Sequence, residues 1–163
     1  MRSKALVLFG LLMLTIGAAA IHAQQQQRRT PAPTEVKVWP LEEQTQHAKE
    51  LQATKMTNWP FFQEDKYNTE LRNLAGKQPV LVHGKRVDFM IIRDGGGTFS
   101  YGGQLVDGKA GGDEGDMTGT SIKGGTTKVL KPGDVVFVPA GVPHYFSEIP
   151  DHVTEILVRW DVK

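Results

Sequence analysis

Short runs of apolar or alternating residues, separated by glycines, fill the second half of the chain. Many short strands at close spacing are typical of antiparallel sandwiches and barrels. The expected strands are residues 80–83, 87–93, 98–101, 104–106, 118–122, 126–130, 135–138, 144–147 and 153–160. The pattern predicts an all-β barrel over residues 77–163, with the glycine-rich segment 107–116 as a loop between two halves of the sheet.

The pattern before this region is different. Residues 41–76 have a pattern typical of helices, with two charged stretches on either side of Trp59-Pro60. This pattern predicts one or two short helices flanking the barrel. Residues 24–40 are polar and broken by prolines, with little to bury, so we expect a flexible leader.

The first 23 residues have the layout of a cleaved secretory signal. Arg2 and Lys4 precede an unbroken apolar run over residues 5–16, which is followed by small residues up to Ala23. A bilayer span needs about 20 apolar residues, and this run is shorter. We therefore expect residues 1–23 to be a signal peptide, removed near Ala20 or Ala23, and the mature protein to be soluble in the periplasm or outside the cell.

Composition excludes several kinds of chemistry. The chain has no cysteine, which rules out disulfides, thiolate ligands, a cysteine nucleophile and a lipid-modified cysteine. Without Arg2 and Lys4, 17 basic residues face 18 acidic ones. Nucleic-acid binding depends on clustered basic charge, so no nucleic-acid partner is indicated, and no membrane partner is expected once the signal is removed.

The most informative stretch runs from Gly133 to His144. Gly133 and Asp134 favour a tight turn into the apolar strand 135–138, and Gly141 permits the chain to reverse after it. This segment resembles the second conserved motif of the cupin superfamily, in which a Gly-Asp turn and an apolar strand precede Pro-x-Gly-x-x-His. In that family the histidine, here His144, points into the barrel mouth and binds a metal.

The first cupin motif is matched in part. His83 stands where the family has its second histidine, Asp88 where it has a glutamate, and Gly95 where it has a glycine, whereas Leu81 replaces the first histidine. The resemblance thus implies His83, Asp88 and His144 as metal ligands. Asp88 is one methylene shorter than glutamate, so it could also act through a water or bond to a neighbouring backbone group.

The resemblance covers about residues 78–162 and is to small single-domain cupins of the secreted bacterial type. It implies a jelly-roll β-barrel, a possible homodimer, and a divalent transition metal such as iron, manganese, zinc or nickel. Asp88, Tyr101 and Arg93 are the candidate catalytic residues. The favoured hypothesis is a metal-dependent enzyme acting on a small oxygenated molecule; a metal-free protein that binds a small ligand and a structural or interaction module are the alternatives.

Overall fold

The computed structural model describes residues 30–162. The predicted signal, residues 1–23, and the first part of the predicted leader lie outside this range. The described elements are the helix α2 (Leu41–Thr54) and the strands β1 (Asn58–Gln63), β2 (Tyr67–Leu74), β3 (Val80–Val82), β4 (Arg86–Gly95), β5 (Gly97–Tyr101), β6 (Gln104–Val106), β7 (Lys109–Ala110), β8 (Met117–Gly119), β9 (Ser121–Lys123), β10 (Thr126–Leu130), β11 (Val135–Val138), β12 (His144–Glu148) and β13 (Val153–Asp161). Within residues 30–162, no helix is long and apolar enough to cross a membrane.

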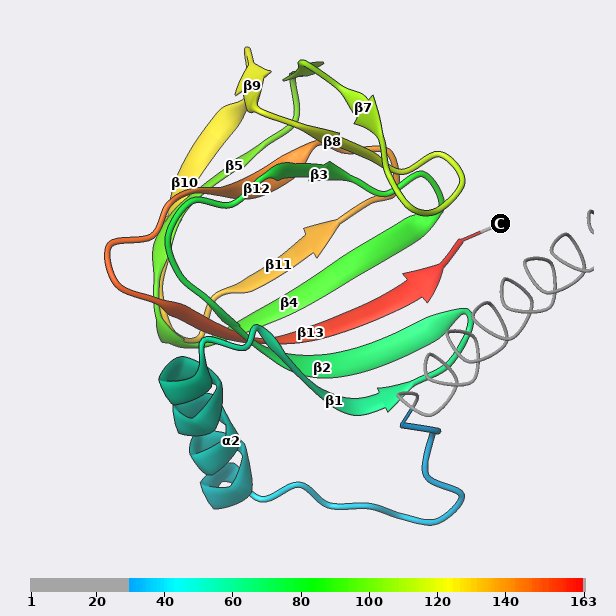
Figure 1. Ribbon diagram of the computed structural model, residues 1–163, viewed down its shortest axis with the longest axis vertical. Helices are drawn as coiled ribbons and strands as arrows, with labels where there is room; N and C mark the ends of the chain where they lie inside the picture. The colour runs from blue at the N-terminus through cyan, green and yellow to red at the C-terminus, as the bar shows by residue number, and fades with distance from the viewer. Residues whose placement is uncertain (1–29, 163) are drawn as a thin grey trace, which may run out of the picture.

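Two antiparallel sheets face each other and form a jelly-roll barrel (Figure 1). One sheet has the strand order β1-β2-β13-β4-β11, and the other has the order β10-β5-β12-β3-β8-β7. Strands β6 and β9 pair separately as a two-stranded ribbon. The last strand, β13, lies between β2 and β4, so the C-terminal strand is paired on both sides with strands from the first half of the barrel. The all-β jelly-roll prediction is confirmed.

The core fills the space between the two sheets. Its buried apolar residues come from both halves of the barrel: Leu74, Met90, Ile92, Phe99, Leu130, Val138, Phe146, Val153 and Leu157. Because side chains alternate along a strand, Val153 and Leu157 of β13 point inward together with Glu155 and Arg159. The inner face of the sheet therefore carries charged groups next to its apolar core.

Helix α2 covers the outer face of the same sheet, where Leu51 packs with Phe61 and Leu71 (Figure 1). The helix begins after Pro40 and ends where Lys55 adopts a left-handed conformation. The described part of the predicted leader, residues 30–40, contains no helix or strand, but it is attached to the barrel. The amide of Gln63 donates to the carbonyl of Thr30, and the Trp39 ring lies edge-on to Phe61.

The prediction of a helical extension over residues 41–76 is wrong beyond Thr54. Residues 58–63 and 67–74 form β1 and β2, and β2 pairs with β13 along its whole length as well as with β1. The spacing of Leu71 and Leu74 suits a helix locally. Hydrogen bonding to two neighbouring strands outweighs that local preference, as tertiary context often does.

Gly95 ends β4 at a position that only glycine fits. Its φ is +68°, and a Cβ there would overlap the carbonyl oxygen of His152. Gly76 has a similar φ of +65° but nothing within 4 Å of an added Cβ. Both substitutions to alanine should cost about 1–2 kcal/mol for the backbone conformation, and Gly95→Ala should cost roughly 1–3 kcal/mol more for the overlap.

Urea denaturation of the two glycine variants measures this difference. Equal losses of stability in Gly95→Ala and Gly76→Ala would show that the contact with His152 is relieved without cost.

Candidate metal centre

His83, Asp88 and His144 come together at one end of the barrel. His83 directly follows β3, Asp88 lies in β4, and His144 begins β12. Their potential ligand atoms all lie within 4.8 Å of one another. The amide of Gly141 donates to the carbonyl of His83 at 2.7 Å, which ties the turn before His144 to the first motif. The three ligands expected from the sequence thus form one cluster.

Both histidines are held through Nδ1 and present Nε2 to Asp88. His144 Nδ1 lies 2.9 Å from the carbonyl oxygen of Val142, which can only accept, so this nitrogen carries the hydrogen. His83 Nδ1 lies 3.1 Å from Asp116 Oδ2. Asp88 Oδ2 is 3.5 Å from His144 Nε2 and 3.8 Å from His83 Nε2. Metal-binding histidines are typically held in this way, by a carboxylate or carbonyl on the second ring nitrogen.

Three acceptor atoms converge in this arrangement. His83 Nε2 is buried and has no hydrogen-bond partner among residues 30–162. With both Nδ1 atoms protonated, the two imidazole lone pairs and the Asp88 carboxylate oxygen face one another. Buried acceptors that face one another are unfavourable unless a cation lies between them. The donor set therefore fits a divalent metal ion.

Electrostatics favour the protonation states that metal binding requires. Burial lowers the pKa of His83, and this outweighs the opposing effects of Asp88 and Asp116. Burial alone would raise the pKa of Asp88, but the side chains of His144 and Arg159 beside it hold it well below its usual range. At neutral pH His83 is thus neutral and Asp88 ionised, as metal ligands must be.

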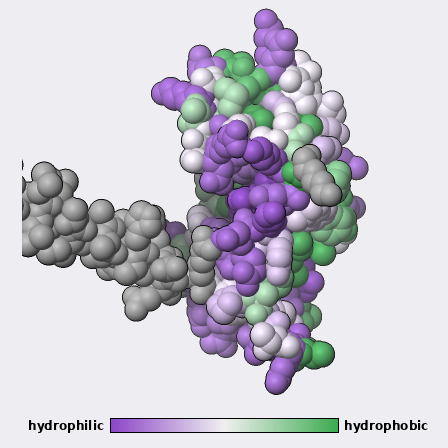
Figure 2. All heavy atoms as spheres, turned by 90° about the vertical axis from the view of Figure 1, so that its right-hand side faces the viewer, coloured by the Kyte–Doolittle hydropathy of each residue, from purple (hydrophilic) through white to green (hydrophobic). Residues whose placement is uncertain are grey.

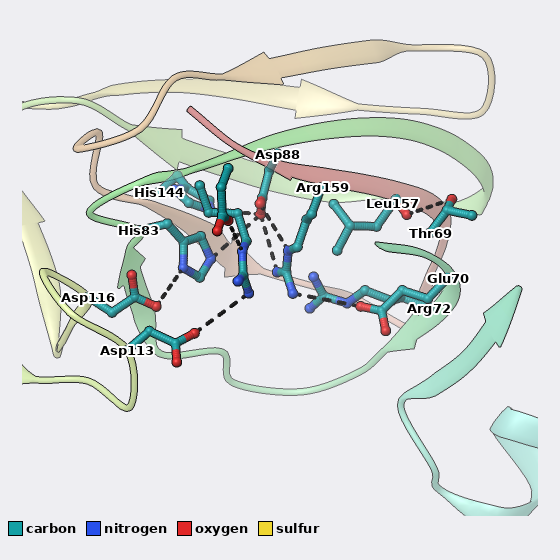
Figure 3. A network of polar contacts seen from close by, with 12 residues as sticks. Thr69, Glu70, Arg72, His83, Asp88, Asp113, Asp116, His144, Leu157 and Arg159 are labelled. Atoms are coloured by element: carbon teal, nitrogen blue, oxygen red, sulfur yellow. Dashed lines mark hydrogen bonds and ion pairs between the residues drawn. The ribbon is translucent and has the colours of Figure 1, made fainter. Parts of the chain in front are cut away.

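Arg159 orients Asp88 from the neighbouring strand (Figure 3). The two residues are direct cross-strand partners in the β13–β4 pairing. Arg159 Nε donates to Asp88 Oδ1 at 2.9 Å and Nη2 donates to Oδ2 at 3.3 Å, so the guanidinium holds both oxygens while Oδ2 also faces the histidines. On its other side, the guanidinium lies 3.8 Å from Glu70 Oε1. Arg159 was not predicted from the sequence. It could have been found there, because strand alternation places this charged residue on the same face as the apolar Val153 and Leu157.

The glycine-rich loop closes this end of the barrel. Asp116, besides contacting His83, accepts a hydrogen bond from the Gly84 amide at 2.9 Å. Glu114 pairs with Lys85, and Asp113 lies 3.7 Å from Arg86. Figure 2 shows hydrophilic residues gathered over the end of the molecule where this loop lies. Apart from the two-residue strand β7, the segment is a loop as predicted, and its role in holding His83 was missed.

A cavity of about 230 Å³ leads into the barrel from the side opposite to the glycine-rich loop. Asp88 and His144 line it, and so does Leu81, the direct cross-strand partner of His144. Its full lining is Thr57, Arg72, Leu74, Gln78, Pro79, Leu81, Asp88, Met90, Phe99, His144, Tyr145, Phe146 and Glu155. Thr57 and Pro79 are exposed and mark the mouth. Leu81 thus gives the cavity an apolar wall where a fourth ligand would otherwise stand.

The other two candidate catalytic residues do not line the cavity of the cluster, although Tyr101 is the direct cross-strand partner of His144. Arg93 is exposed and lines a depression beside α2, because it lies an odd number of residues from Asp88 on the same strand and faces outward. Tyr101 stacks on Phe99 with ring centroids 5.9 Å apart, and it lines a separate groove along β11. Neither residue lines the cavity of Asp88 and His144.

The two facing sheets, with His83 and His144 at one end, make a jelly roll, the fold that the resemblance of the sequence to cupins implies. Among solved structures, the chain is similar to BH2720 from Bacillus halodurans, with a TM-score of 0.55 at 11% identity, over 82% of this chain and 87% of that one. This similarity shows the fold alone. No protein-family model and no curated protein matches the chain.

Two further structures have lower TM-scores. A conserved protein with a double-stranded beta-helix domain from Klebsiella pneumoniae gives 0.47 at 13% identity, over 81% of this chain and 90% of that one. The hydroquinone 1,2-dioxygenase PnpCD, in complex with Cd²⁺ and 4-hydroxybenzonitrile, gives 0.44 at 16% identity, over 82% of each chain. Similarities at this level transfer neither an activity nor a ligand.

Proposed function

We propose that this protein is a divalent-metal-dependent enzyme that acts on a small oxygenated molecule bound in the barrel cavity. The observation that carries the proposal is the convergence of His83 Nε2, His144 Nε2 and Asp88 Oδ2, next to a cavity that His144 and Asp88 line. Two histidines and one carboxylate are the donor set of non-haem iron sites, and the same set suits zinc.

Each residue of the cluster has a distinct part in this proposal. His83, His144 and Asp88 would hold the ion, and a divalent ion bound there supplies Lewis-acid polarisation of an oxygen on the substrate. Arg159 donates to both oxygens of Asp88 and so fixes the orientation of the carboxylate. Leu81 and Phe99 line the cavity with apolar surface, which limits the water near the reacting oxygen.

A metal-free binding protein is the second candidate, and one contact favours it. Arg159 already pairs with Asp88, so the buried carboxylate is compensated without a metal. Such a protein would use the same cavity to bind a small polar molecule and leave it unchanged. We further propose export of the protein, on the basis of the signal pattern in residues 1–23.

Turnover separates the two candidates. The protein is incubated, metal-free or loaded with one divalent ion at a time, with a mixture of small hydroxy acids, keto acids and sugars, and their consumption is followed by mass spectrometry. The enzyme proposal expects consumption in a metal-loaded sample and none in the metal-free one. Saturable binding without consumption under every loading would favour the binding protein instead.

Asp116 should act as a positioning residue for His83. Removing such a hydrogen-bond partner typically lowers metal affinity by about 10–100-fold, so we expect this loss in Asp116→Asn, measured by calorimetric titration with zinc. Asp113→Asn is the matched control, because Asp113 lies in the same loop and pairs with Arg86. Equal metal affinity in the two variants would contradict a role for Asp116 in holding His83.

A further inference from the structure

A second charged group lies in the wall of the cavity, apart from the metal cluster. Glu155 of β13 and Arg72 of β2 are direct cross-strand partners, and both line the cavity. Arg72 Nη1 lies 3.5 Å from Glu155 Oε1. The Glu155 side chain has 0% exposure, so it is buried completely inside the barrel. Neither residue was singled out from the sequence.

The pair leaves polar atoms without partners. Both carboxyl oxygens of Glu155 and the Nε of Arg72 are buried and make no hydrogen bond within the part of the chain that the structure describes. An unsatisfied buried polar group carries a free-energy cost, and a buried ion pair compensates for its desolvation only when its remaining atoms are hydrogen-bonded. A pair that served stability alone would be expected to satisfy these atoms.

We propose that Arg72 and Glu155 form a recognition subsite for a small ligand that carries a hydroxyl group beside a carboxylate or carbonyl oxygen. A hydroxyl both donates and accepts, so it can bond to Glu155 whether that carboxyl is ionised or protonated. The Arg72 N–H groups donate to the neighbouring oxygen, and such a charge-assisted bond is strong. Small 2-hydroxy acids have this pair of groups on adjacent carbons.

The cavity sets the size of this ligand. At about 30 Å³ for each water, a volume of about 230 Å³ corresponds to roughly eight waters. Leu81, Met90 and Phe99 provide apolar surface for a short carbon chain. The inference rests on the proposed function in that it names the substrate class for the same cavity, but the recognition step itself uses no metal.

Matched pairs of probes test the subsite. Glycolate and lactate are titrated against acetate and propionate, which lack only the hydroxyl, and binding is followed by chemical-shift changes in protein NMR spectra. One additional hydrogen bond to a charged group should give roughly tenfold tighter binding of the hydroxy acids. The preference should be present in metal-free protein.

Two variants complete the test. Glu155→Met alone would leave Arg72 as an unpaired buried charge, so the informative variant combines Arg72→Met with Glu155→Met. The preference for hydroxy acids should disappear in this double variant and persist in Glu50→Met, which changes a carboxylate on the outer helix. No preference in the wild type, or a preference that survives in the double variant, would overturn the subsite.

Zinc binding, measured in the same samples, separates this inference from the proposed function. A wild-type protein that binds zinc but does not prefer hydroxy acids overturns the subsite alone. A hydroxyl preference in a protein that binds neither zinc nor, in the same assay, iron, manganese or nickel supports the subsite and contradicts the metal-dependent enzyme.

Discussion

His144→Ala is expected to abolish the stabilisation of the protein by divalent metal. A metal that binds only the native state, at a concentration a hundredfold above its Kd, raises the free energy of unfolding by about 2.7 kcal/mol. For a domain of this size that corresponds to roughly 5–10 °C in Tm. Thermal unfolding of wild type and variant, each compared with its own metal-free form, measures the effect.

His47→Ala provides the control for the histidine substitution. His47 lies on α2 and stacks on Trp59 with ring centroids 3.9 Å apart, far in the fold from the inner face of the sheet. This variant should keep the full metal-dependent shift. A shift that persists in His144→Ala would remove His144 from the ligand set.

Arg159→Met should destabilise the metal-free protein by about 3–5 kcal/mol, because it leaves the buried Asp88 without its charged partner. Asp88 is 2% exposed, so water cannot replace the guanidinium. The pKa of Asp88 is held below its usual range, so its contribution is complete above about pH 4, the unfolded value, and is lost as the pH falls below that. Denaturation at pH 7 therefore measures the full effect.

A double variant distinguishes loss of the charge partner from loss of packing. Combining Arg159→Met with Asp88→Leu removes both charges, and such replacements are often neutral or stabilising. We expect it to recover most of the stability lost in Arg159→Met. A double variant as unstable as the single one would show that Arg159 acts through packing of its side chain.

Local patterns predicted the barrel well. Strands β6, β10 and β11 have the predicted bounds, and the motif from Gly133 to His144 places its histidine at the start of β12. These segments are short, rich in β-branched or apolar residues and bounded by turn residues, so residue type and turn chemistry are sufficient to identify them. The same reasoning was wrong for residues 67–74, since their strand conformation depends on pairing with β13, which follows about 80 residues later.

The candidate site was predicted in part. The resemblance to the two cupin motifs identified His83, Asp88 and His144, because these residues keep fixed sequence distances from nearby glycines and prolines. Arg159, Asp116 and Glu155 reach the cavity or the cluster through sheet register and loop closure, which no local pattern encodes. Arg93 could have been set aside from the sequence, since strand alternation places it on the face opposite to Asp88.

We propose that His83, Asp88 and His144 hold a divalent metal, and elemental mass spectrometry of the protein purified without a histidine tag tests this claim. We predict close to one equivalent of a transition metal for each chain, and a loss of that metal in His144→Ala. Wild-type protein that holds no metal, even after incubation with iron, manganese, zinc and nickel, would contradict the claim.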